Sequence, residues 1–336
     1  MKSDREITFL ETVAILVSSI IGVGILPLPL FAVRAAGSGA PLVTLLGSLL
    51  GFVGLVLLSL LGKRFPRQTL VQYSEVIIGK WTSWVGSTAI ILFFGLLTAF
   101  AAREFGEVVI TSVLKNTPVE VTVIVMLILA AISSRHSMTT FAYIHYFYLP
   151  FLLVPAVLIV ILSLKNADYI NLQPNTGSGI VNMVPGIFSI GNLFQSSFIL
   201  SCVIPAMRNP NKALKASAFG ILIAGGLYVA IVAATVGVFG AEETKLLLWP
   251  TLELAKTTSL PANVLERLDA AFLAVWVTAV FTTLYSTYTL TIVSITNLFR
   301  LRDYRMLSFF YCRSSLCSPC SRKASWKCTR RSNRSA

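Results

Sequence analysis

The chain has 336 residues, of which 55% are hydrophobic and 12% are charged, and its formal net charge is +13. A composition this apolar is typical of integral membrane proteins and excludes a soluble globular domain. The net charge does not indicate nucleic-acid binding, because residues 306–336 alone carry seven Lys/Arg and no acidic residue. The remaining basic excess is what the inner loops of a membrane protein provide.

Eight apolar stretches of about 20 residues each predict eight transmembrane helices. They run roughly over 9–34, 40–61, 84–108, 119–134, 140–164, 185–206, 214–239 and 268–298. With the N-terminus inside, 13 Lys/Arg of the loops fall on the inner side of the membrane and six on the outer side. Because inner loops are enriched in Lys and Arg, we expect a multi-pass membrane protein with a cytoplasmic N-terminus.

The first stretch contains the segment IGVGILPLP at residues 21–29. Each proline lacks an N–H and clashes with the carbonyl four residues earlier, so Pro27 frees the carbonyl of Val23 and Pro29 frees that of Ile25. We interpret the segment as a helix broken near the bilayer midplane, where two half-helix ends suit the two charges of an amino acid. The alternative is a proline-kinked helix without a ligand.

Two connections between the stretches predict further helices. In the inner connection 63–81, Leu70, Tyr73 and Ile77 recur at helical spacing, which predicts a short amphipathic helix on the membrane surface. The outer connection 241–267 contains WPTLELA, which predicts either a helix lying on the opposite surface or a simple connector.

The sixth stretch is irregular like the first. Its polar residues are Asn192, Gln195, Ser196, Ser197 and Ser201, and they lie between Gly191 and Pro205. Helices one and six hold equivalent positions in an inverted repeat of five helices, and interruptions at such positions indicate a transporter-type binding site. We therefore expect a site between the two breaks.

This predicted site combines the bare backbone of the first break with side chains from other stretches. Gly22 and Gly24 leave space beside the backbone, and free N–H groups at the start of the second half-helix would hold a ligand carboxylate. Thr283 and Thr287 share a helix face; they line a cavity, bind a cation together with freed carbonyls, or bond back onto their own helix. The apolar lining favours a small apolar amino acid. The candidate substrate-binding residues are Gly22, Val23, Gly24, Ile25, Thr98, Ala99, Ser196, Ser197, Phe198, Ile199, Thr283 and Thr287.

The other polar residues of the spans have structural interpretations. Arg103 and Glu107 predict an i, i+4 ion pair near the outer end of the third span, with an ion-coupling role for Glu104 as the alternative. We assign His145 to an aromatic belt at the inner interface, with a proton relay as the alternative. Cys202 is interpreted as a small apolar residue of the sixth span.

The membrane spans predict no enzyme, metal site or cofactor. The chain has two histidines, no phosphate-cradling Gly-Lys-Ser/Thr loop and no nucleophile elbow. We expect residues 1–305 to form the membrane domain and 306–336 a basic tail rich in Cys and Ser. That tail is interpreted as disordered, as translated out of the original frame, or as a zinc-binding segment around Cys317-x-x-Cys320.

Six segments carry a resemblance to a known family, in order over about residues 5–305. They are IGVGILPLP (21–29), FPRQTLVQYSEVIIGKW (65–81), NLQP (171–174), FGAEETKLLLWPTLELAK (239–256), LERLDAAFLAVWVTAVFTTLYSTY (265–288) and NLFRLRDYR (297–305). In these segments the chain resembles the B subunit of bacterial spore germinant receptors, an endospore germination permease within the amino acid–polyamine–organocation transporter superfamily.

The resemblance implies an all-α, LeuT-like inverted-repeat transporter fold with broken helices one and six, of whose ten transmembrane helices about eight are present. It implies a receptor subunit that binds a small amino-acid-like germinant and triggers spore germination. It also implies assembly with A and C subunits in the lipid bilayer of the spore inner membrane. No acid or lysine lies near the centre of spans one, two or four to eight, which favours sensing over pumping. The alternatives are an ion-coupled amino acid transporter of the same superfamily and a non-functional truncated relic.

Overall fold

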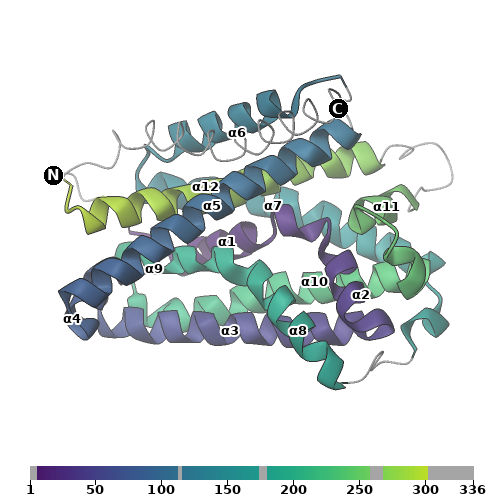
Figure 1. The fold of residues 1–336 in the computed structure, drawn as a ribbon, viewed down its shortest axis with the longest axis horizontal. Coiled ribbons are helices and arrows are strands. Elements are labelled where there is room, and N and C mark those ends of the chain that lie inside the picture. The colour runs from purple at the N-terminus through teal and green to yellow at the C-terminus, as the bar shows by residue number, and fades with distance from the viewer. Residues whose placement is uncertain (1–5, 113–115, 174–179, 258–267, 302–336) are drawn as a thin grey trace, which may run out of the picture. The chain divides into compact units, whose positions relative to one another are not determined.

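The structure, a computed structural model, is helical throughout the part of the chain that it describes (Figure 1). The described residues are 6–112, 116–173, 180–257 and 268–301. Within them the one β-type pairing is a parallel bridge between Ile7 and Met207. The predicted all-α fold is therefore confirmed, while the predicted tail 306–336 lies outside the described residues.

The chain divides into two compact units. Unit 1 comprises Met1–Arg67 and Ala142–Thr283, and unit 2 comprises Gln68–Phe141 and Leu284–Ala336. The helices of unit 1 are α1 (Phe9–Ile20), η1 (Val23–Ile25), α2 (Leu28–Ala36), η2 (Gly37–Gly39), α3 (Ala40–Arg64), η3 (Leu164–Asn166), η4 (Tyr169–Leu172), α8 (Ile180–Gly191), η5 (Asn192–Ile199), α9 (Leu200–Val203), η6 (Ile204–Ala206), η7 (Pro210–Lys212), α10 (Ala213–Thr244) and α11 (Pro250–Thr257). Those of unit 2 are α4 (Leu70–Ile78), α5 (Lys80–Ser112) and α6 (Val119–Ser133). Two further helices, α7 (Met138–Ser163) and α12 (Leu268–Leu298), contribute residues to both units.

Six helical runs are long and apolar enough to cross a membrane: Leu28–Arg64, Lys80–Ser112, Met138–Asn166, Met183–Ala206, Pro210–Thr244 and Phe272–Leu298. Two more apolar helices, Phe9–Ile20 and Val119–Ser133, are shorter. Each of the eight predicted stretches coincides with one of these runs or helices. The first stretch is divided between α1 and α2, because the chain leaves the α-helical conformation between Ile20 and Leu28, and η2 then joins α2 to α3 within the run Leu28–Arg64.

Helix α10 forms the centre of unit 1, where it packs against α3, α1 and α2. Small residues permit close contact, since a Cβ added at Gly220 would lie 3.0 Å from Leu16 and one added at Gly225 would lie 3.0 Å from Ser48. Close approach through small residues is the usual way in which helices pack within a membrane. Helix α10 is thus the central helix of unit 1, in contact with α3 and with the two helices, α1 and α2, on either side of the first break.

A backbone clasp ties the two broken helices of unit 1 together at one end. The N–H of Ile7, just before α1, donates to the carbonyl of Ala206 at 2.9 Å, and the N–H of Arg208 donates to the carbonyl of Ile7 at 3.0 Å. These are the hydrogen bonds of the Ile7–Met207 bridge. Helix α1 then starts with a capping box, in which Thr8 and Glu11 satisfy each other's backbone N–H groups.

Unit 2 contains the predicted inner helix. Helix α4 is present, with Val71 and Tyr73 buried and Ile77 51% exposed. The prediction of a helix here is confirmed, and its placement on the membrane surface stays a prediction.

The outer helix predicted at WPTLELA is also present, as α11, but it packs into unit 1. Five of its eight residues are buried, and it contacts α10 and α2. The prediction of a helix is confirmed, and the apolar face of this helix is covered by protein. This placement brings Thr251 to the first break.

Candidate functional site

The first predicted break is present between α1 and α2. Helix α1 ends at Ile20, Gly22 has non-helical backbone angles (φ −130°, ψ −119°), and α2 begins at Leu28 with proline in its first turn. The freed carbonyl of Ile25 accepts a hydrogen bond from the Thr251 hydroxyl at 2.7 Å. The missing intrahelical bond predicted from Pro29 is thus replaced by a side chain from α11.

The last carbonyls of α1 are used by two threonines of α12 that belong to unit 1. The hydroxyl of Thr282 shares its proton between the carbonyl of Ala279 on its own helix at 2.8 Å and that of Ser18 at 3.0 Å, and the hydroxyl of Thr283 donates to the carbonyl of Ser19 at 2.9 Å. The bond to Ala279 is the predicted bond back onto the same helix, whereas the bonds that join α12 to α1 were not predicted. They do satisfy the carbonyls that the break leaves unpaired.

Two aromatic side chains complete the capping of the break, and sequence reasoning missed both. The Tyr228 hydroxyl of α10 donates to the carbonyl of Ile20 at 2.7 Å, and the Trp276 indole of α12 donates to the carbonyl of Gly22 at 3.3 Å. Both side chains are buried. A single tyrosine or tryptophan within an apolar helix was the available signal, since buried Tyr and Trp usually find a hydrogen-bond partner.

The two glycines of the break differ in what surrounds them. A Cβ at Gly22 would overlap the Thr283 hydroxyl and lie 2.5 Å from the Thr283 Cβ. A Cβ at Gly24 would lie 3.1 Å from Cδ2 of Leu193, the far end of a flexible side chain. Gly22 therefore permits the close approach of α12, whereas Gly24, which is half-buried, lies beside η5.

The second predicted break is an eight-residue 3-10 segment, η5, which contains Ser196, Ser197, Phe198 and Ile199. Ser196, Ser197 and Ile199 are buried and Phe198 is half-buried. Since η5 contacts α1, the structure brings the predicted residues of both breaks into one neighbourhood of unit 1.

The remaining predicted site residues lie in unit 2, where two of them meet. The Thr98 hydroxyl of α5 donates to the Thr287 hydroxyl of α12 at 2.9 Å, and both side chains are buried. Thr287 also bonds back to the carbonyl of Leu284 at 3.2 Å, one of the roles expected from sequence. Ala99 is buried next to Thr98 on α5.

His145 is not a belt residue, which corrects the sequence-based assignment. Its side chain is fully buried (0% exposed), and its Nε2 lies 3.3 Å from the carbonyl oxygen of Thr282. Tyr143 and Tyr146 of the same helix are exposed. His145 follows Tyr143 by two residues, a rotation of about 200° around the helix, so it faces the opposite side. A nitrogen next to a carbonyl oxygen must carry the proton, so His145 donates to α12.

The predicted ion pair of the third span is confirmed. Arg103 Nε and Glu107 Oε1 are 3.0 Å apart, and both side chains are partly exposed. Cys202 is buried with a free thiol, as expected for an apolar position. In the part of the chain that the structure describes, no cluster of three or more His, Cys, Asp or Glu residues is placed to hold a metal ion.

Comparison with solved structures identifies the fold. The chain is similar to Mhp1, described as a nucleobase-cation-symport-1 family transporter in a closed conformation with bromovinylhydantoin bound. The TM-score is 0.68 at 14% identity, and the match covers 94% of this chain and 72% of that chain. The inward-facing conformation of Mhp1 matches with a TM-score of 0.57 over 96% of this chain and 72% of that chain. This likeness confirms the predicted all-α, LeuT-like transporter fold, and at such low identity it shows the fold alone.

Comparison of sequences identifies the family. The chain is similar to spore germination protein YndE of Bacillus subtilis (strain 168), with 24% identity over 296 residues that cover 88% of this chain and 82% of that protein. Spore germination protein B2 of the same organism is 27% identical over 304 residues, which cover 90% of this chain and 82% of that protein. The family described as "Spore germination protein" matches residues 6–318. The chain therefore belongs to the spore germination protein (spore permease) family.

Proposed function

We propose that the chain is the membrane subunit of a spore germinant receptor, which binds a small amino-acid-like germinant at the break of helix one and triggers germination. Family membership supports the germination role, and the likeness to a transporter structure described with a bound small molecule supports a ligand site. The proposal includes assembly with A and C subunits in the spore inner membrane, with the N-terminus cytoplasmic.

The asymmetry of the break is the observation that carries the proposal. The last carbonyls of α1 accept hydrogen bonds from Tyr228, Thr282 and Thr283. The N-terminus of α2 has no side-chain cap. A helix N-terminus presents unpaired N–H groups and a partial positive charge, so this end suits the carboxylate of a ligand.

The second candidate function is ion-coupled transport of an amino acid, which the likeness to a cation symporter favours. A cation at the break would require carbonyl oxygens as ligands. Thr282 and Thr283 already lie within hydrogen-bond distance of the carbonyls of Ser18 and Ser19, so a cation would have to break these hydrogen bonds and take the hydroxyl oxygens as further ligands. This competition favours ligand sensing over cation coupling.

A matched pair of glycine variants tests the site. Spores carrying Gly24→Leu should lose the response to whichever of the twenty amino acids triggers germination, measured as the fall in optical density. Gly24→Ala should weaken the response in graded fashion. The control is Gly54→Leu, because a Cβ at Gly54 meets no atom within 4 Å. It adds the same side chain to a membrane helix and should leave the response intact.

Protein amount in the spore membrane is measured for each variant by immunoblot. An intact response of Gly24→Leu at wild-type protein levels would show that the break is a structural kink. Uptake of the same radiolabelled amino acid by proteoliposomes, driven by a sodium or proton gradient, would instead establish the transporter.

A further inference from the structure

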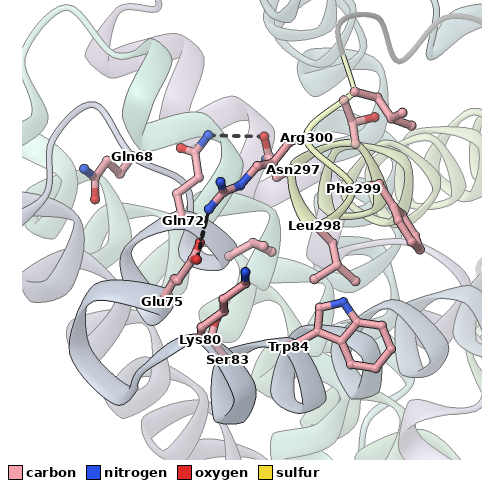
Figure 2. Close-up of a pocket in the computed structure, with 13 residues that line it drawn as sticks. Gln68, Gln72, Glu75, Lys80, Ser83, Trp84, Asn297, Leu298, Phe299 and Arg300 are labelled. Atoms are coloured by element: carbon pink, nitrogen blue, oxygen red, sulfur yellow. Dashed lines mark hydrogen bonds and ion pairs between the residues drawn. The ribbon is translucent and has the colours of Figure 1, made fainter.

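A polar pocket lies within unit 2, on residues that the site at the break does not use. It has a volume of about 840 Å³ and is formed by α4, the start of α5 and the end of α12 (Figure 2). This volume is within the range of about 300–1,000 Å³ that is typical of ligand sites. The charged residues of its lining are Glu75, Lys80 and Arg300.

The wall of the pocket is held by specific polar contacts. Arg300 donates from one guanidinium nitrogen to both carboxylate oxygens of Glu75, each at 2.9 Å. Arg300 adopts a positive φ of 50°, a conformation that costs free energy in a residue other than glycine. Asn297 accepts from Gln72 at 3.4 Å and donates to the Thr69 hydroxyl at 2.9 Å. These bonds fix the end of α12 against α4.

Lys80 supplies a positive charge that no acidic residue in the described part of the chain neutralises. Its side chain points into the pocket from the first residue of α5, and among the described residues it makes no hydrogen bond or ion pair (Figure 2). Because Glu75 neutralises Arg300, the described lining residues carry a net charge of one positive unit, from Lys80. The ligand that this charge favours is an anion.

The border of the pocket is apolar and exposed. The large apolar side chains exposed on α4 and the start of α5 are Val76, Ile77, Ile78, Trp81, Trp84 and Val85. Trp81 is 84% exposed, and Trp84, one turn later, lines the pocket itself. In a membrane protein, exposed apolar residues face the acyl chains, and tryptophans mark the level of the lipid headgroups. The pocket therefore opens where headgroups lie.

We propose that this pocket binds the phosphate headgroup of an anionic phospholipid. The Lys80 ammonium pairs with the phosphate, the amides of Gln68 and Gln72 supply polar contacts, and the apolar border contacts the acyl chains. Basic pockets at the ends of transmembrane helices are a known form of lipid site. The site is independent of the germinant site, because it shares no residue with it.

The test titrates the purified full chain in detergent with short-chain phosphatidylglycerol and counts bound lipid by native mass spectrometry. Lys80→Gln should weaken binding about fivefold, which corresponds to the loss of one cation at an anionic surface. Glu75→Gln removes the opposing charge and should strengthen binding by a similar factor. Lys63→Gln, at an exposed basic residue outside the pocket, is the control and should change binding less than twofold.

Two further titrations separate the sources of the phosphate group. Phosphatidylcholine, which is zwitterionic, should bind at least fivefold more weakly than phosphatidylglycerol. Inorganic phosphate at millimolar concentration should not displace the lipid; displacement would assign the pocket to a free phosphate compound. Equal affinity for both lipids would overturn the proposal. So would weaker binding by Glu75→Gln, since that result would mean that the charged residues only hold the wall together.

Discussion

Replacing Gly22 with alanine should destabilise unit 1, because the new methyl group would occupy the position of Thr283. The added Cβ would overlap the Thr283 hydroxyl, lie 2.5 Å from its Cβ and lie 3.1 Å from its Cγ2. Overpacking of this kind costs about 1–3 kcal/mol. If Thr283 moves away, its hydrogen bond to the carbonyl of Ser19 is lost as well, at about 1 kcal/mol. The expected loss is about 2–4 kcal/mol in total.

Gly24→Ala is the matched comparison, with the same chemical change two residues away. The nearest atom to its Cβ is Cδ2 of Leu193 at 3.1 Å, and a leucine terminus retreats by a few tenths of an ångström at little cost. We expect a loss below about 1 kcal/mol. The measurement is thermal unfolding of the purified protein in detergent, in which Gly22→Ala should lower the Tm by several degrees more than Gly24→Ala.

A double-mutant cycle tests the cause of the effect. Thr283→Gly removes all three atoms that the new Cβ would meet, so Gly22→Ala should cost much less in that background. The expected coupling free energy is about 1–3 kcal/mol, the size of the overpacking penalty. Equal Tm values for Gly22→Ala and Gly24→Ala, or no recovery with Thr283→Gly, would refute the close approach of α12 to the break.

Three other results are expected. Tyr228→Phe removes the 2.7 Å hydrogen bond to the buried carbonyl of Ile20, which keeps its bond from the Gly22 N–H, and should lower stability by about 0.5–1.5 kcal/mol, measured by the same unfolding assay; an unchanged Tm would contradict that bond. His145→Gln should lower the Tm, whereas His136→Gln at an exposed position should change stability by less than about 0.5 kcal/mol, and equal effects would argue against a buried His145. Leu246→Cys in a background without native cysteines, at a position that is 84% exposed, should react with an impermeant maleimide in intact cells, and reaction only after permeabilisation would reverse the orientation.

The breaks could be predicted from sequence because their causes are local. Proline removes a donor and clashes with a carbonyl four residues earlier, whatever lies around it. The unpaired carbonyls of the first break follow directly, and Ile25 shows one of them paired by Thr251. The irregular sixth helix follows in a similar way from its run of polar residues, which takes the form of a 3-10 segment.

The groups that satisfy the break could not be predicted, because they are far away in the chain. Tyr228 and Trp276 are more than 200 residues from the carbonyls that they cap. Both residues lie on helices that are apolar on most sides, so the sequence shows little periodicity. The sequence therefore does not show which side of each helix faces the core. The same lack of a clear face led to the wrong assignment of His145, which lies on a helix rich in apolar residues on every side.

The Ile7–Met207 bridge joins the start of α1 to the end of the sixth helix, so that these two half-helices are held together. Because Ile7 is bonded to Ala206 and Arg208, a tilt of α1 must carry the end of helix six with it. The other halves of the two broken helices, α2 and α8, pack against each other and form a second pair. We therefore expect a change of angle at one break to be transmitted to the other through the Ile7–Met207 bridge. A germinant bound at the first break, as proposed, would then act on both broken helices.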